Sequence, residues 1–193
     1  MYINDAGKAW KSGFTIVELL IVIVVIGILA AITIVAFRGM TARAQVSKAG
    51  VAVSSFQRLL NLYKADNGTY PHPGGSNPYM VCVGKIANYP ATSGFAAGEC
   101  GNTNIVVSNQ LNTALGVYAS SVPDGSLPFQ LWDSGYPGDG GIRGIVYRYY
   151  APGSAYQLTY KLPGIQTCPV STSTSTDTGN GSSFTNCTVD VGF

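Results

Sequence analysis

The stretch GFTIVELLIVIVVIGILAAITIVAF, residues 13–37, decides the fold of this 193-residue chain. Between residues 19 and 37 the only polar side chain is that of Thr33. A helix of this length measures about 28 Å, just enough to cross a bilayer core of about 30 Å. Lipid offers the backbone no hydrogen bonds, so the many β-branched residues do not prevent a helix here. We therefore expect a helix that can span a membrane.

The residues before the apolar run distinguish it from an ordinary secretory signal. The leader MYINDAGKAWKSG, residues 1–13, carries two lysines, which are expected to stay in the cytoplasm. An ordinary signal places its cleavage site after the apolar core. Here the Gly13-Phe14 junction precedes the core, and the apolar run continues past the alanines at 30–31, which imitate a cleavage site. The polar, cysteine-bearing remainder of the chain is expected to be exported.

Glu18 lies at the start of the apolar run and needs an explanation. A charged side chain costs roughly 2.5–3.5 kcal/mol near the bilayer centre and less near the interface. If the chain were cut after Gly13, the new α-amino group of Phe14 would be the nearest unmatched positive charge. Helical geometry keeps that amine from its own Glu18, whereas the amine of a neighbouring subunit could reach it. The alternative is a carboxylate that simply lies at the membrane interface.

These residues resemble a known signal. The segment GFTIVELL, residues 13–20, is similar to the G-F-T-x-x-E-L signal of type IV prepilins and the related pseudopilins, and the close match covers roughly residues 8–37. The resemblance implies that a prepilin peptidase cleaves after Gly13 and methylates the amine of Phe14. It also implies that Glu18 neutralises that amine on a neighbouring subunit during assembly. The apolar helix would first hold the subunit in the membrane and then pack with its copies in a filament core.

Beyond residue 38 the helix is expected to continue with a single apolar face. Apolar or small residues recur there in steps of three and four, at Ala42, Val46, Ala49, Val53, Phe56, Leu60 and Tyr63. Gly68 predicts the end of the helix, because glycine readily adopts the left-handed cap. We expect one continuous helix over about residues 14–66, although two separate helices would give the same pattern.

The remaining sequence predicts a small antiparallel sheet packed on the second half of the helix, the layout seen in pilins. The candidate strands are residues 129–132, 142–150 and 155–162, and a hairpin turn at 152–154 joins the last two. A short helix is expected near residues 109–118. The predicted fold class is α+β, with a disulfide-bounded loop at the C-terminus.

Four cysteines suggest disulfides in an exported chain. They are Cys82, Cys100, Cys168 and Cys187. Four cysteines allow three pairings, and separations of 18 and 19 residues favour the two local ones, each worth roughly 3 kcal/mol in the chain-entropy model. The alternative is four free buried thiols. The Ser/Thr-rich tail, residues 171–182, lies between the last two cysteines and is expected to be a mobile exposed loop.

The composition argues against an enzyme and against a nucleic-acid surface. Charged residues make up 10% of the chain, below the roughly 25% usual for soluble globular domains. The net charge of +2 is too small to suggest a nucleic-acid surface. His72 is the only histidine, and Glu18 and Glu99 are the only glutamates, so a catalytic acid–base pair is hard to assemble. The lack of a CxxC motif disfavours zinc, and the aspartates within 124–139 lack EF-hand spacing. We expect no metal and no cofactor.

The domain organisation expected is a leader at 1–13, a transmembrane or filament-core helix at 14–37 and a globular pilin head at 38–193. We expect a structural subunit of an extracellular type IV pilus, held as a single-pass protein in the cytoplasmic membrane before assembly. Its expected partners are copies of itself, the prepilin peptidase, the inner-membrane assembly machinery and the membrane. Such a filament would serve adhesion, twitching motility or DNA uptake. The alternatives are a pseudopilin of a type II-like secretion or DNA-uptake system, and a membrane-anchored binding protein that never polymerises.

Overall fold

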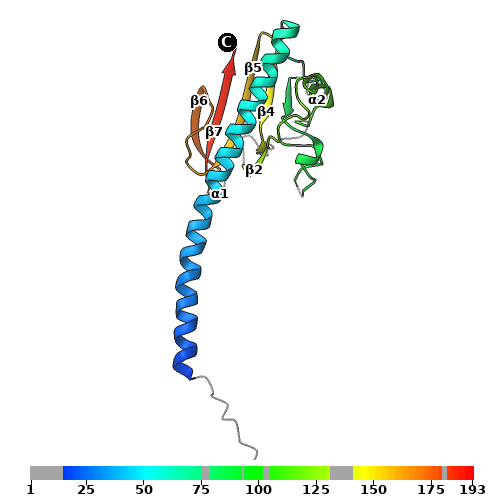
Figure 1. Ribbon diagram of the computed structural model, residues 1–193. Coiled ribbons are helices and arrows are strands. Elements are labelled where there is room, and N and C mark those ends of the chain that lie inside the picture. The colour runs from blue at the N-terminus through cyan, green and yellow to red at the C-terminus, as the bar shows by residue number, and fades with distance from the viewer. Residues whose placement is uncertain (1–14, 75–78, 93, 102–104, 131–140, 180–181) are drawn as a thin grey trace, which may run out of the picture. The chain divides into compact units, whose positions relative to one another are not determined.

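The computed structural model describes residues 15–74, 79–92, 94–101, 105–130, 141–179 and 182–193, with backbone alone at 35–38, 129–130, 177–179 and 182. The chain divides into two compact units, residues 1–40 and 41–193, and each is described by itself. One helix, α1 (Ile16–Asn67), contributes residues to both units (Figure 1).

The long helix predicted over about residues 14–66 is confirmed. α1 contains 52 residues from Ile16 to Asn67. It ends where Gly68 adopts a positive φ of 77° and donates its backbone N–H to the carbonyl of Lys64 at 2.8 Å. Gly68 has no Cβ to oppose this left-handed conformation, so it forms the predicted cap.

The described residues of the unit 41–193 form two antiparallel sheets. The strands are β1 (Met80–Cys82), β2 (Ser126–Gln130), β3 (Ile142–Gly144), β4 (Val146–Tyr150), β5 (Ala155–Pro163), β6 (Ser173–Gly179) and β7 (Ser182–Val191). Five of them form one sheet in the order β1-β4-β5-β7-β6, and β2 pairs with β3 in the other. A short helix, α2 (Asn109–Leu115), lies where one was expected, and a 3-10 turn spans Ile86–Asn88.

The main core lies between the second half of α1 and one face of the five-stranded sheet (Figure 1). α1 contributes Ala49, Ala52, Val53, Phe56, Leu59 and Leu60, all buried. β5 contributes alternate residues, as a strand with one buried face must: Tyr156, Leu158, Tyr160 and Leu162. The ring of Phe56 meets the ring of Tyr147 edge-on at 5.7 Å. The predicted apolar stripe of the helix is therefore the face on which the sheet packs.

The single strand predicted over residues 142–150 is wrong, because two strands from different sheets meet there. Ile145 separates β3 from β4. Its N–H donates to the carbonyl of Gly125 at 2.9 Å, whereas its carbonyl accepts from the N–H of Val83 at 2.9 Å. The chain thus changes neighbours at this residue. Beside it, Gly144 leaves room for Tyr89, whose hydroxyl would lie only 2.6 Å from a Cβ at this position.

The mobile loop predicted at residues 171–182 is also wrong as to structure. Most of that segment is β6, which pairs with β7 from Ser173 opposite Thr188 to Gly179 opposite Ser182. Low sequence complexity suggested a loop, but threonine fits a pleated surface well and the partner strand β7 was not anticipated. The strand expected at 129–132 begins earlier, as β2 at Ser126, and residues 131 and 132 lie outside the described part of the chain.

The buried side chain of Arg143 holds the segment of residues 90–99 in place. Its side chain is 8% exposed and donates hydrogen bonds to three backbone carbonyls. The acceptors are those of Glu99 at 2.8 Å, Pro90 at 2.7 Å and Ala96 at 3.2 Å. The guanidinium group also lies 4.8 Å from the centre of the Phe95 ring. Arginine suits this role because its planar fork carries five N–H donors.

An ion pair joins α1 to the loop before β2. Lys48 Nζ lies 2.8 Å from Asp124 Oδ2, and both side chains are 43% exposed. Ser126 donates to the other oxygen of Asp124 from its backbone N–H and its hydroxyl, at 2.9 and 2.7 Å. Partial burial raises the pKa of Asp124, but the hydrogen bonds from Lys48 and Ser126 outweigh it and hold the pKa below its usual value.

Replacing Arg143 with methionine should lower the free energy of unfolding by about 2–4 kcal/mol, because three carbonyls lose a charged donor. Chemical denaturation of the full chain in detergent, followed by circular dichroism, measures the change. Arg58→Met, at an exposed position of α1, is the matched control and should have little effect. Equal stability of the two variants would contradict the role given to Arg143.

Replacing Asp124 with asparagine should lower the free energy of unfolding at pH 7 by up to about 1 kcal/mol, since the pair is largely exposed. Because the pKa of Asp124 is depressed in the folded state, its contribution is present above the unfolded pKa of about 3.9 and is lost as the pH falls through the folded pKa. The difference between parent and variant should therefore shrink below about pH 4. A double-mutant cycle with Lys48→Met isolates the pair, and a coupling energy that does not change with pH would refute it.

Candidate assembly site

Glu18 lies in the first turn of α1 and is held there by Thr15, the residue just before the helix. The backbone N–H and the hydroxyl of Thr15 both donate to Glu18 Oε2 at 2.8 Å. In return, the backbone N–H of Glu18 donates to the hydroxyl of Thr15 at 3.2 Å. This reciprocal pair is a capping box, which satisfies N–H groups that the start of a helix would otherwise leave without acceptors.

The capping box gives Glu18 a partner in its own chain, which the analysis of the sequence missed. The spacing Thr-x-x-Glu before an apolar run is the pattern that predicts such a box, so the signal was present at residues 15–18. Both bonds end on one carboxylate oxygen, and a carboxylate can accept about four bonds. Glu18 can therefore accept from a neighbouring amine without breaking these bonds. Gly13 and Phe14 lie outside the described residues.

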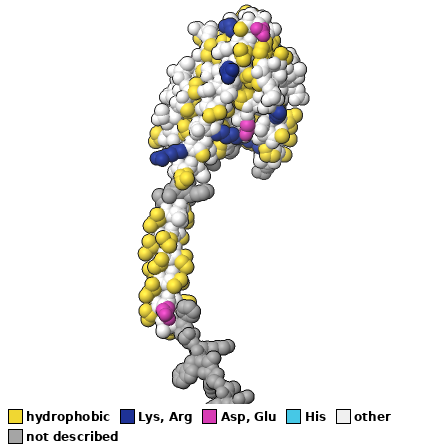
Figure 2. Space-filling model, viewed as in Figure 1, with side chains coloured by type: hydrophobic (Ala, Val, Ile, Leu, Met, Phe, Trp, Pro, Cys, Tyr) yellow, Lys and Arg dark blue, Asp and Glu magenta, His cyan; other side chains and the backbone are white. Residues whose placement is uncertain are grey.

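The apolar side chains that follow are not covered by the described part of the chain. From Ile16 to Ile34 every large apolar side chain is between 48% and 86% exposed. Figure 2 shows hydrophobic side chains over the visible face of this part of the helix. In the described part of the chain, α1 is the one helix long and apolar enough to cross a membrane, by length and composition. A surface of this kind requires lipid or other apolar surfaces around it.

The one polar side chain in the apolar run is already satisfied by its own helix. The hydroxyl of Thr33 lies 3.0 Å from the carbonyl of Leu29 and 2.9 Å from that of Ala30, to which it donates. Threonine commonly bonds back to the preceding turn in this way. Thr33 can therefore lie in lipid or against another helix without an additional acceptor.

The cysteines form the two local disulfides that their spacing favoured. Cys82 is joined to Cys100 and Cys168 to Cys187, each with Cα atoms 5.8 Å apart. The first lies in a small second core between β1 and the segment that Arg143 holds. The second attaches the loop after β5 to β7 and so bounds the C-terminal region.

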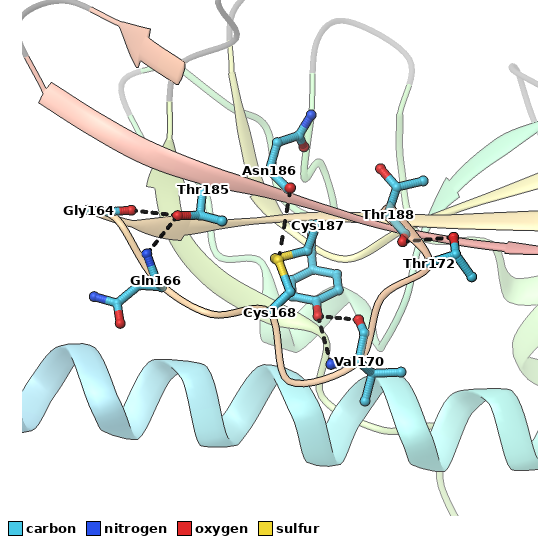
Figure 3. Close-up of a disulfide and its surroundings, with 10 residues drawn as sticks. Gly164, Gln166, Cys168, Val170, Thr172, Thr185, Asn186, Cys187 and Thr188 are labelled. Atoms are coloured by element: carbon cyan, nitrogen blue, oxygen red, sulfur yellow. Dashed lines mark hydrogen bonds between the residues drawn. A yellow bond between two sulfur atoms is a disulfide. The ribbon is translucent and has the colours of Figure 1, made fainter. Parts of the chain in front are cut away.

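Hydrogen bonds secure that loop on both sides of the second disulfide (Figure 3). On one side, the hydroxyl of Thr185 donates to the carbonyl of Gly164 at 2.9 Å and accepts from the N–H of Gln166 at 2.8 Å. On the other side, the hydroxyl of Tyr160 donates to the carbonyl of Val170. The loop is therefore fixed before and after Cys168.

The hairpin is attached where the loop enters β6. The backbone N–H of Thr172 donates to the carbonyl of Thr188 at 2.7 Å, and its hydroxyl lies 3.1 Å from Asp190 Oδ2. The N–H of Asp190 donates back to the hydroxyl of Thr172 at 2.8 Å. Among the residues that the structure describes, no group of three or more His, Cys, Asp or Glu side chains could hold a metal.

Comparisons with known proteins agree with the pattern of the N-terminal segment. Residues 11–34 match the family model described as the prokaryotic N-terminal methylation motif. The fimbrial protein EcpC of Eikenella corrodens is 37% identical over 95 residues, which are 49% of this chain and 61% of that protein. The type IV major pilin protein PilE1 of Neisseria gonorrhoeae is 40% identical over 78 residues, which are 39% of this chain and 36% of that protein.

A protein of a secretion system is also similar to part of this chain. The type II secretion system core protein G of Aeromonas hydrophila is 38% identical over 64 residues, which are 33% of this chain and 45% of that protein. The chain therefore spans less than two thirds of the length of each of these three relatives. No solved structure gives a significant match. The chain thus carries the methylation motif and is similar, over part of its length, to a fimbrial protein, a type IV major pilin and a type II secretion protein, and its long helix with a small antiparallel sheet agrees with the layout expected from that resemblance.

Proposed function

We propose that this chain is the structural subunit of an extracellular type IV pilus. It is made as a membrane-anchored precursor, cleaved after Gly13 by a prepilin peptidase and methylated on the amine of Phe14. The observation that carries the proposal is the helical segment from Ile16 to Ile34, whose large apolar side chains are at least 48% exposed. Such a surface fits lipid before assembly and the helices of other subunits afterwards. The methylation motif over residues 11–34 supports the processing step.

In this proposal Glu18 has two sets of donors. Its own Thr15 orients the carboxylate in every subunit. The methylated amine of a neighbouring subunit then adds a charge-assisted hydrogen bond, which is stronger in an apolar surrounding than in water. The pair also neutralises two charges that would be costly to keep separately in an apolar filament core. Copies of the chain and the inner-membrane assembly machinery are thus the proposed partners.

A second candidate function is that of a pseudopilin in a type II-like secretion or DNA-uptake system. The observation that favours it is the 38% identity to the secretion-system core protein G. Both functions use the same apolar helix, but they differ in whether long fibres form on the cell surface. Recovery of such fibres by shearing therefore distinguishes a pilus subunit from a pseudopilin. A membrane-anchored protein that never polymerises is the third candidate, and the methylation motif with its pilin relatives disfavours it.

The intact mass of protein sheared from the cell surface tests processing and export together. We expect the mass of residues 14–193 with one added methyl group and four hydrogens lost to two disulfides. The same processed mass in membranes, with none in the sheared fraction, would favour the pseudopilin. A chain that still begins at Met1 would refute the processing step.

Replacing Glu18 with alanine should reduce the yield of sheared fibres at least tenfold while the subunit still accumulates in the membrane. Each tenfold corresponds to about 1.4 kcal/mol, less than the value of a charge-assisted bond that is lost in an apolar core. Quantitative immunoblots of the sheared and membrane fractions measure both amounts.

Thr33→Ala is the matched control for Glu18→Ala, because it removes a polar side chain from the same helix that bonds only within that helix in the described structure. Fibre yield should be close to normal in this control. Normal yield from Glu18→Ala would overturn the proposed contact, and equal losses in both variants would assign the effect to general damage of the helix.

A further inference from the structure

β6 is an edge strand with few of the devices that usually protect an edge. It is the last strand in the order β1-β4-β5-β7-β6, so it pairs with β7 alone among the residues that the structure describes. Its register with β7 runs without a shift over seven residues. It contains no lysine and no proline, and its residues from Ser173 to Thr176 are exposed. Natural edge strands are commonly short, bulged or charged, because a regular edge can pair with another chain.

The opposite edge of the same sheet is protected. β1 has only three residues, and Cys82 at its end forms a bridge to Val107. The disulfide between Cys82 and Cys100 covers it further. The sheet therefore has one long free edge in its described part, at β6, and Figure 1 shows that strand on the outer side of β7.

We propose that β6 pairs edge to edge with the β6 strand of a second copy of this chain, in antiparallel orientation. A foreign peptide would need pockets for its alternate side chains, which a strand of serines and threonines does not offer. A second copy has the same short neutral side chains at every paired position from 173 to 176. The two five-stranded sheets would then continue into one another through backbone hydrogen bonds.

Charge selects the register of this pairing. Asp177 is the one charged residue in β6. A pairing centred on Asp177 places the two aspartates opposite each other, and one centred on Thr176 makes them diagonal neighbours, which also interact across strands. Centring on Ser175 places each Asp177 opposite the neutral Ser173 of the other copy. We therefore assign Ser175 to the centre of the contact.

A single edge of this length is a weak contact, since isolated two-stranded pairings are marginal in water. Repetition along two filaments would make it strong, because each contact raises the effective concentration for the next one. This filament-level consequence, the lateral bundling of fibres, rests on the proposed function. The pairing of two chains does not, so the two can be tested separately.

Cross-linking of the full chain in detergent tests the pairing itself. In Ser175→Cys the two thiols of a pair lie opposite each other, with Cα atoms about 4.5–5.5 Å apart, within disulfide reach. In the control Ser173→Cys, on the same strand, the two cysteines would be separated by about 13 Å, beyond that reach. Under a mild oxidant we expect at least fivefold more covalent dimer from Ser175→Cys. Equal yields, an excess from Ser173→Cys or no dimer from either variant would overturn the proposal.

Electron microscopy of sheared fibres tests the bundling. Ser175→Asp places two negative charges opposite each other at the centre of the contact, each also diagonal to Asp177 of the other copy, and should disperse bundles, whereas Ser175→Thr should keep them. Bundles that persist in Ser175→Asp would refute the filament-level consequence. Failure of the parent chain to form fibres would count against the proposed function, and the cross-linking result would still decide the pairing.

Discussion

A single helix has to satisfy two different surroundings, and the rest of the structure depends on how it does so. The first part of α1 presents apolar side chains in all directions and so requires lipid or other helices. The part from Ala49 to Leu60 buries one face against the five-stranded sheet and exposes the other. The first part cannot be stable in water alone, and the second part cannot be stable without the sheet. Only the second part of the helix therefore needs support from its own chain, and the sheet and the two disulfides supply it.

Buried aromatic rings and one buried arginine stabilise the inside of the second unit, and no simple sequence pattern predicts their positions. Tyr147 and Tyr156 are fully buried between the helix and the sheet, with ring centroids 5.9 Å apart. Burial raises the pKa of both phenols, with neighbouring phenols adding to the effect at Tyr147. Arg143 adds to the small second core where the chain between β1 and α2 has few strands. A charged group that donates to three carbonyls organises irregular backbone where pairing between strands cannot.

The sequence predicted the parts of the fold that rest on local chemistry. The apolar run, the three-and-four spacing from Val46 to Tyr63 and the glycine at 68 each act within a few residues, and they correctly predicted the helix, its buried face and its end. The cysteine spacing also favoured the observed pairs. The bond from Thr15 was not predicted although its spacing from Glu18 was visible, because the carboxylate was matched with an amine of another chain. The change of sheet at Ile145 and the strand β6 depend on residues far away in the sequence, and local patterns do not contain that information.

The second disulfide gains a different meaning from the sequence of the strand beside it. Residues 171–176 read Ser-Thr-Ser-Thr-Ser-Thr, a two-residue repeat, and side chains in a strand also alternate every two residues. A slip of β6 by two positions along β7 would therefore leave nearly the same side chains on each face, and the repeat cannot choose between these alignments. The Cys168–Cys187 bond and the contacts of Thr172 with Asp190 fix one end of the hairpin. They select one alignment of β6 on β7 among several that the side chains would allow equally. The repeat could therefore change in length without moving the point at which the hairpin begins.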